Sequence, residues 1–203
     1  MTDFARTERL ALTALFRAVG PDAPTLCEGW DARDLAVHLV IRDRDPLALP
    51  GHMAPAVAKK VPWLGKRTRE SEETLHAMPW DRLVGRVGEG EPRWSPLKAK
   101  PLRELANAVE FLVHHEDVRR AQEEWAPRRL PEAQLAAALR AVKGMAIPVA
   151  LKDRKTYVLE AGDHGTHRIG RTGEVTTLHG EPTEMLLWFF GRRDHALVSV
   201  DRG

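Results

Sequence analysis

Between residues 3 and 150, hydrophobic residues recur at intervals of three and four positions, which predicts amphipathic helices rather than strands. Asp31 fits the N-cap of one of these helices, with Asp34 as its partner in a capping box. Asp3 fits the same position near the start of the chain. The predicted helical segments are residues 3–19, 32–42, 66–86 with a break at Met78-Pro79-Trp80, 101–124, and a segment that begins at Pro131 and is ended or kinked by Pro148.

Proline and glycine are concentrated in two stretches between these helices, residues 43–65 and 88–101. We expect both to be irregular connections, the first with room for about one helical turn. Connections of this length often carry function. His52 lies in the first stretch and could line a cleft.

Beyond residue 155, the hydrophobic spacing changes to the two-residue alternation of β-strands. The predicted elements are strands at residues 156–161, 166–171 and 174–179, a compact apolar helix at 182–190 that Gly191 ends, and a last strand at 196–201. Helices followed by a short run of strands predict an α+β protein. We expect a helical bundle over residues 1–150 and a small strand-helix-strand domain over residues 151–203.

Composition narrows the classes of function. The chain has 203 residues, with 31 Lys and Arg against 29 Asp and Glu, and no long basic run, so nucleic acid is not an expected partner. Its single cysteine, Cys27, excludes a disulfide within the chain and suits a reducing cytoplasm. No stretch approaches the ~20 apolar residues that span a membrane, and the first residues lack the apolar run of a signal peptide.

The stretch AVEFLVHHEDVRRA, residues 108–121, raises the question of a metal site. On a helix with about 100° per residue, His114 lies at about 40° and Asp117 at about −20° from Glu110. These three side chains therefore share one face with the apolar stripe. His115 lies at about 140°, so the two adjacent histidines should not serve one ion.

A buried column of Glu110, His114 and Asp117 is costly unless each group has a partner, and a cation would provide one. Imidazole and carboxylate groups together suit Zn²⁺ and similar divalent ions. A third ligand must come from another element. His38 is the natural choice, because it lies on the predicted core-facing stripe of residues 32–42, beside Leu39.

The segment LCEGWDARDLAVHL, together with the later E-x-x-x-H-x-x-D, resembles the DinB-like metal-binding family, in particular the branch of mycothiol-dependent maleylpyruvate isomerases and their uncharacterised actinobacterial relatives. The resemblance implies a four-helix bundle that holds a divalent ion, most often zinc, through His38, Glu110 and His114. The ending GEVTTLHGEPTEMLLWFFGRRDHALVSV resembles the small sterol-carrier-protein-like α/β domain of these isomerases.

The resemblance also implies a chemistry. Three protein ligands leave one metal position for a low-molecular-weight thiol such as mycothiol, which would bind as a thiolate and add to a small electrophile. Asp117 would orient a ligand or a basic group. Arg192 could bind a substrate carboxylate bidentately, or equally be a surface arginine that follows a helix.

Three hypotheses remain open at this point. The first is a metal- and thiol-dependent isomerase or S-transferase. The second is a metal-binding or stress-linked module without catalysis. The third is a helical protein in which the column of Glu110, His114 and Asp117 forms salt bridges with arginines such as Arg42. Cys27 is a weaker candidate for a nucleophile, since a small buried thiol is its expected role. The sequence fixes neither the substrate nor the native metal, and either a monomer or a homodimer fits.

Overall fold

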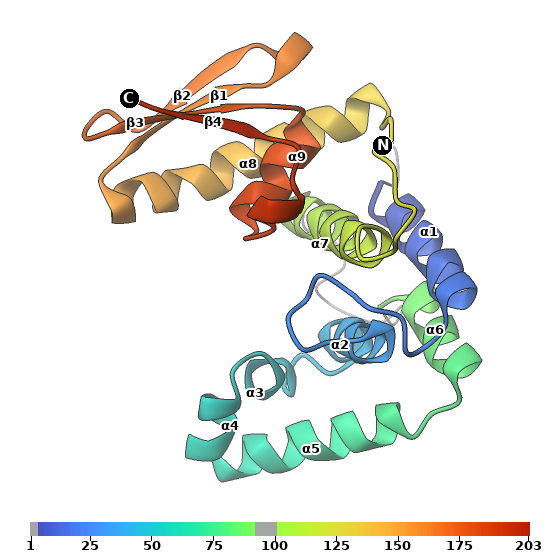
Figure 1. The fold of residues 1–203 in the computed structure, drawn as a ribbon. Helices are drawn as coiled ribbons and strands as arrows, with labels where there is room; N and C mark the ends of the chain where they lie inside the picture. Colours follow the sequence, from blue (N-terminus) through green and yellow to red (C-terminus); the bar gives the residue numbers. More distant parts are fainter. Residues whose placement is uncertain (1–3, 92–100) are drawn as a thin grey trace. The chain divides into compact units, whose positions relative to one another are not determined.

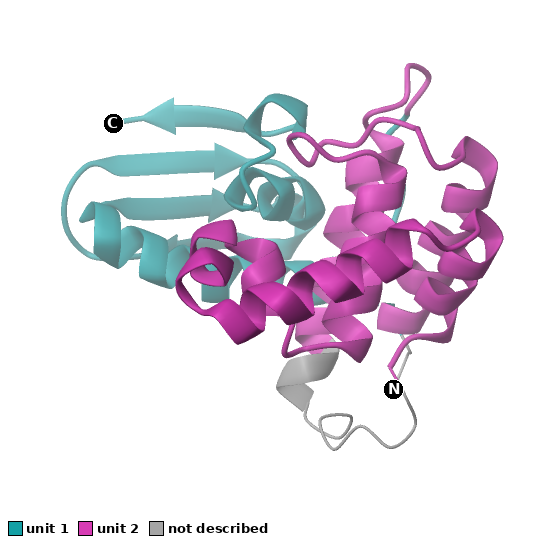
Figure 2. Ribbon diagram, turned by 90° about the horizontal axis from the view of Figure 1, so that it is seen from below, with its two compact units in different colours: residues 1–4, 126–203 teal, residues 5–125 magenta. Residues whose placement is uncertain are grey.

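The computed structural model describes residues 4–91 and 101–203 (Figure 1). It divides into two compact units, one of residues 5–125 and one of residues 126–203 with Phe4 (Figure 2). The second unit begins before the expected boundary at residue 150, because the long helix at residues 132–153 packs with the sheet and its other helix. The Asp3 cap and most of the connection at 88–101 lie outside the described residues.

The unit of residues 5–125 is helical, and its main core lies among α1, α2, α5, α6 and α7. Large side chains that are fully buried there include Leu12, Phe16, Leu39, Leu83 and Phe111. The helices are α1 (Phe4–Val19), α2 (Ala32–Arg44), α3 (Leu49–Met53), α4 (Pro55–Lys60), α5 (Pro62–His76), α6 (Trp80–Glu89) and α7 (Pro101–Arg119).

Helix α2 begins as the sequence predicted. The Asp31 carboxylate accepts a hydrogen bond from Asp34 N at 2.9 Å, and the Asp34 carboxylate accepts one from Asp31 N at 3.1 Å. This capping box satisfies amide groups that the first turn leaves unpaired. Leu35 and Leu39 are fully buried, and His38 between them is only 4% exposed. The cap therefore fixes the start of a core helix that carries one buried histidine.

The stretch at residues 43–65 contains more helix than expected, since α3, α4 and the start of α5 lie within it. The prolines explain the difference. Pro50, Pro55 and Pro62 occupy the first or second position of these helices, where the missing N–H is not needed. The prolines therefore begin helices here instead of breaking them.

The C-terminal unit combines a mixed sheet with two packed helices. The described strands follow the order β2-β1-β3-β4, with β1 antiparallel to β2 but parallel to β3, and β3 antiparallel to β4. Buried side chains such as Leu159, Leu178 and Met185 form its core. The elements are α8 (Glu132–Asp153), β1 (Thr156–Glu160), η1 (Gly162–His164), β2 (Thr166–Ile169), β3 (Val175–His179), α9 (Pro182–Phe189), η2 (Arg193–His195) and β4 (Ser199–Arg202).

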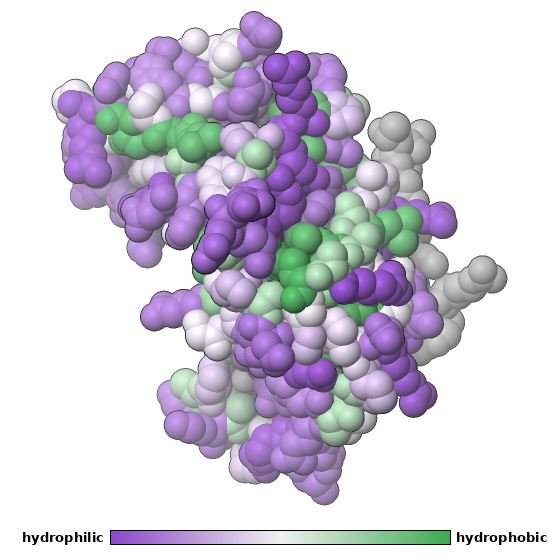
Figure 3. Space-filling model, turned by 45° about the vertical axis from the view of Figure 1, so that its right-hand side comes forward, coloured by the Kyte–Doolittle hydropathy of each residue, from purple (hydrophilic) through white to green (hydrophobic). Residues whose placement is uncertain are grey.

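Two expectations concern helix α8. Pro148, expected to end or kink the helix, lies inside it, and the helix continues to Asp153. In the described part of the chain, α8 is also the one helix long and apolar enough to cross a membrane by length and composition, a test that core helices of soluble proteins pass too. Its buried face packs against α9 and the sheet, while Ile147 and Leu151 are exposed. The face of the molecule in Figure 3 is mostly hydrophilic, with hydrophobic residues in separate groups.

Candidate metal centre

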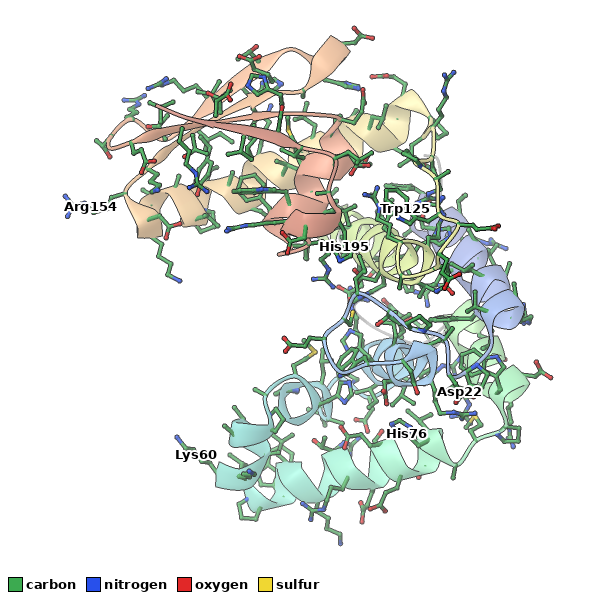
Figure 4. All side chains as sticks on the ribbon, in the orientation of Figure 1. Asp22, Lys60, His76, Trp125, Arg154 and His195 are labelled. Carbon is green, nitrogen blue, oxygen red and sulfur yellow. The ribbon has the colours of Figure 1, made fainter. Side chains whose placement is uncertain are left out.

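Helices α2 and α7 bring His38, Glu110 and His114 together (Figure 4 draws the side chains on these helices). Glu110 Oε1 lies 3.1 Å from His38 Nε2 and 3.4 Å from His114 Nε2. One ligand atom from each residue lies within 4.8 Å of the other two. Neighbouring ligand atoms around a tetrahedral cation with bonds of about 2.0–2.1 Å lie about 3.3–3.4 Å apart. Both the donor set and its spacing therefore fit a divalent ion such as Zn²⁺.

Asp117 contacts the ring nitrogen of His114 that does not face Glu110. Its side chain is fully buried, and its Oδ2 lies 2.9 Å from His114 Nδ1. Because an ionised carboxylate only accepts hydrogen bonds, His114 carries its hydrogen on Nδ1 in this contact. The other ring nitrogen, Nε2, then faces Glu110, as a metal-binding histidine requires.

His115 points elsewhere, as the helical angles predicted. Its Nδ1 lies 2.9 Å from Oε2 of Glu8 on α1, and both side chains are buried. The pair satisfies two polar groups inside the helical core. His115 is therefore a structural neighbour of the cluster and not a member of it.

The three clustered groups have shifted pKa values. Burial by itself would raise the pKa of Glu110, but hydrogen bonds from His114 and His38 and the charges of His114 and Arg42 hold it well below its ordinary value. Burial would lower the pKa of His114, but hydrogen bonds to Asp117, Cys27 and Glu110 raise it well above 6.5. Burial lowers the pKa of His38, although its hydrogen bond to Glu110 opposes the shift. Without a metal, these contacts therefore favour the anionic form of Glu110 and the cationic form of His114, while burial favours the neutral form of His38.

Arg42 provides a second cation for Glu110. It lies one helical turn after His38 on α2, and its Nε is 3.2 Å from Glu110 Oε1. Its guanidinium also donates to Asn107 Oδ1 at 2.9 Å and to Asp43 Oδ1 at 3.2 Å. This is the contact that the purely structural hypothesis predicted. The Glu110 carboxylate can therefore be neutralised by Arg42, by a metal ion, or by both together.

The loop before α2 contributes two residues to the cluster. Cys27 Sγ donates to Asp117 Oδ2 at 3.2 Å and lies 3.8 Å from His114 Nδ1. The Trp30 ring lies 5.2 Å from the His38 ring. This position of Cys27 was not predicted, although Cys27 lies in the same LCEGW segment as Trp30, just ahead of the helix that carries His38.

Arg192, the other candidate catalytic residue, belongs to the C-terminal unit. It is half-buried after α9, and its Nη1 donates to Phe190 O at 2.6 Å. Its suggested contact with a substrate carboxylate stays a prediction.

The fold places the chain among α+β proteins with a helical region followed by a small mixed sheet. No family model and no curated protein matches the sequence. Among solved structures, the chain is similar to a crystal structure of a histidine-to-alanine variant of mycothiol-dependent maleylpyruvate isomerase. The TM-score is 0.62 with 13% sequence identity, over 98% of this chain and 90% of that one. At this identity, the likeness is one of fold.

Proposed function

We propose that the chain binds a divalent metal ion, most suitably Zn²⁺, and uses it with a low-molecular-weight thiol such as mycothiol to isomerise a small electrophile or to transfer the whole thiol to it as an S-transferase. The observation that carries the proposal is the meeting of His38, Glu110 and His114 from two helices. The fold shared with a thiol-dependent isomerase supports it.

The residues of this chain have distinct roles in the proposed chemistry. His38, Glu110 and His114 would hold the ion, and Asp117 keeps the His114 hydrogen on Nδ1. When bound, the cation would favour the thiolate form of the thiol. The thiolate sulfur would add to an electrophilic carbon. In an isomerisation, rotation about the resulting single bond and loss of the thiol would restore the double bond.

The burial of the cluster suits such a reaction. The His38 side chain is 4% exposed and the Asp117 side chain 0%, whereas His114 and Glu110 are partly open at 13% and 23%. The partly open groups leave an approach for a small molecule, while the closed groups keep the ligand geometry fixed. Arg192 is proposed as a substrate-binding residue on the strength of its charge alone.

Metal analysis of the purified protein tests the first step. We expect close to one equivalent of metal in the wild type, and loss of most of it in His38→Ala and His114→Ala. His76→Ala is the matched control, because His76 is a 40% exposed histidine of the same unit. Full metal occupancy in both site variants would disprove the assigned ligands.

Calorimetry with mycothiol then separates an enzyme from a metal-binding module. Metal-loaded wild type should bind the thiol, and thiol-dependent turnover of small electrophiles should require His114. If the loaded protein binds no thiol, the module without catalysis becomes the better description.

A further inference from the structure

The stretch around α3 is held firmly on α5. Thr68 Oγ1 on α5 donates to Ala48 O at 3.1 Å, and both residues are buried. A Cβ atom on Gly51 would lie 2.3 Å from the same Thr68 Oγ1, so only glycine permits this approach. One turn further along α5, Glu72 Oε1 lies 2.7 Å from His52 Nδ1. The hydrogen bond from Thr68, the close approach at Gly51 and the contact with Glu72 therefore together fix the position of the His52 ring.

The contact with Glu72 also fixes where the His52 hydrogen lies. An ionised carboxylate only accepts hydrogen bonds, so Nδ1 carries the hydrogen in this pair. In the neutral ring, Nε2 then presents a lone pair. The His52 side chain is 9% exposed, and no atom of residues 4–91 and 101–203 makes a hydrogen bond with its buried Nε2. A buried acceptor of this kind is costly unless a ligand or solvent satisfies it.

The unsatisfied acceptor adjoins the metal centre. The His52 ring stacks on the His38 ring, with centroids 5.4 Å apart and planes 21° apart, and it lies 5.4 Å from the Trp30 ring. His38 in turn lies 5.4 Å from the His114 ring. Both His52 and Trp30 therefore lie against His38, a member of the candidate metal centre.

We propose that His52, held by Glu72, is a ligand-binding residue of the metal centre, and that its Nε2 accepts a hydrogen bond from an O–H or N–H group of the bound thiol. This inference rests on the proposed function. The lone pair on His52 Nε2, with the Glu72 carboxylate bound to the opposite ring nitrogen, repels ligand carboxylates and favours hydrogen-bond donors. The substrate class is therefore a thiol with a hydroxyl or amide N–H close to its sulfur, in preference to a bare alkyl thiol or a mercapto acid.

A pair of small thiols tests the hydrogen bond directly. 2-Mercaptoethanol carries a hydroxyl donor, and 2-methoxyethanethiol has the same skeleton without it. Both are titrated into cobalt(II)-loaded protein, and binding is followed by the thiolate-to-cobalt charge-transfer absorption. We expect the wild type to prefer 2-mercaptoethanol by about fivefold, the worth of one ordinary hydrogen bond.

Variants of His52 and Glu72 test whether the preference for 2-mercaptoethanol comes from the His52 acceptor. His52→Phe keeps a stacked ring without the acceptor and should bind both thiols equally, while His52→Gln should regain part of the preference. Glu72→Gln should weaken it, and Glu73→Gln, an exposed neighbour on α5, should leave it unchanged. Cobalt content is measured for each variant, so that a loss of thiol preference is distinguished from a loss of the metal.

Two outcomes overturn the inference in distinguishable ways. Equal preference in wild type and His52→Phe, with the charge-transfer absorption intact, overturns the role of His52 and leaves the proposed function standing. Absence of the absorption in the cobalt-loaded wild type overturns both. Nitrogen NMR of His52 gives an independent check, since a pyridine-type Nδ1 would contradict the assigned tautomer.

Discussion

Asp117 and His114 lie three residues apart on α7, and the fully buried carboxylate of the first meets Nδ1 of the second at 2.9 Å. The contact aims Nε2 of His114 at Glu110 and thereby joins a helix face to a candidate metal centre. Cys27 donates to the same Asp117 oxygen from the loop before α2. The Asp117 carboxylate therefore accepts hydrogen bonds from both His114 and Cys27, which lie far apart in the sequence.

Asp117→Asn should weaken metal binding about 10- to 100-fold. The asparagine oxygen is a weaker hydrogen-bond acceptor than the carboxylate, and the side-chain amide can turn its NH₂ group toward His114 Nδ1 instead. Competition with a chromophoric chelator measures the affinity. Asp163→Asn, at an exposed position of the C-terminal unit, serves as the control. An unchanged affinity in Asp117→Asn would show that the contact does not orient a metal ligand.

Metal binding should release about one proton at pH 7. The pKa of His114 in the metal-free protein is raised well above 6.5, so the imidazole is protonated at pH 7 and must lose its proton to become a ligand. Apparent affinity should therefore rise with pH by about tenfold per unit until the pKa of His114 is passed. Calorimetry in buffers of different ionisation enthalpy counts the protons, and an affinity that is flat between pH 6 and 8 would contradict this assignment.

Arg42→Gln separates a metal centre from a purely structural ion pair. If a metal holds Glu110, the variant should keep its metal, and a thousandfold excess of the metal over its Kd should raise the free energy of unfolding by about 4 kcal/mol. If Arg42 is the essential cation, the variant should lose about 1.5–3 kcal/mol, because Glu110 would keep only His38 and His114 as partners, and added metal should restore none of it. Urea unfolding with and without Zn²⁺ measures both quantities.

Gly51→Ala should destabilise the protein by about 1–3 kcal/mol, because the added methyl group overlaps Thr68 Oγ1. The double variant Gly51→Ala, Thr68→Ala removes that oxygen and should lose less than the two single losses added together. Thermal unfolding of the four proteins gives the coupling. Additive losses would mean that the close approach of α3 to α5 is not what requires glycine.

Local periodicity was enough to predict the part of the site that lies on one helix. A 100° step per residue places Glu110, His114 and Asp117 on one face and sends His115 to another, and the structure has the same arrangement. The capping box of α2 is a local pattern of the same kind, and it too was predicted correctly. Both follow from interactions within four residues along the chain.

The parts that escaped prediction depend on contacts between distant residues. The spacing around Cys27 and His52 does not identify their partners, because Asp117 and Glu72 lie 90 and 20 residues away. Helix α8 is apolar on several sides, so its pattern did not show whether it packs with the earlier helices or with the sheet. The boundary between the units therefore needed the structure.

The prolines at the starts of α3, α4 and α5 have a consequence for the segment that carries His52. Each proline restricts the unfolded chain, so that less conformational entropy is lost when this segment takes its place on α5. The stretch at residues 43–65, expected to be an irregular connection, is therefore largely helical and takes its place at a lower entropic cost. Ligand capture at His52 should therefore proceed in a single kinetic phase, with no slow step in which this segment becomes ordered.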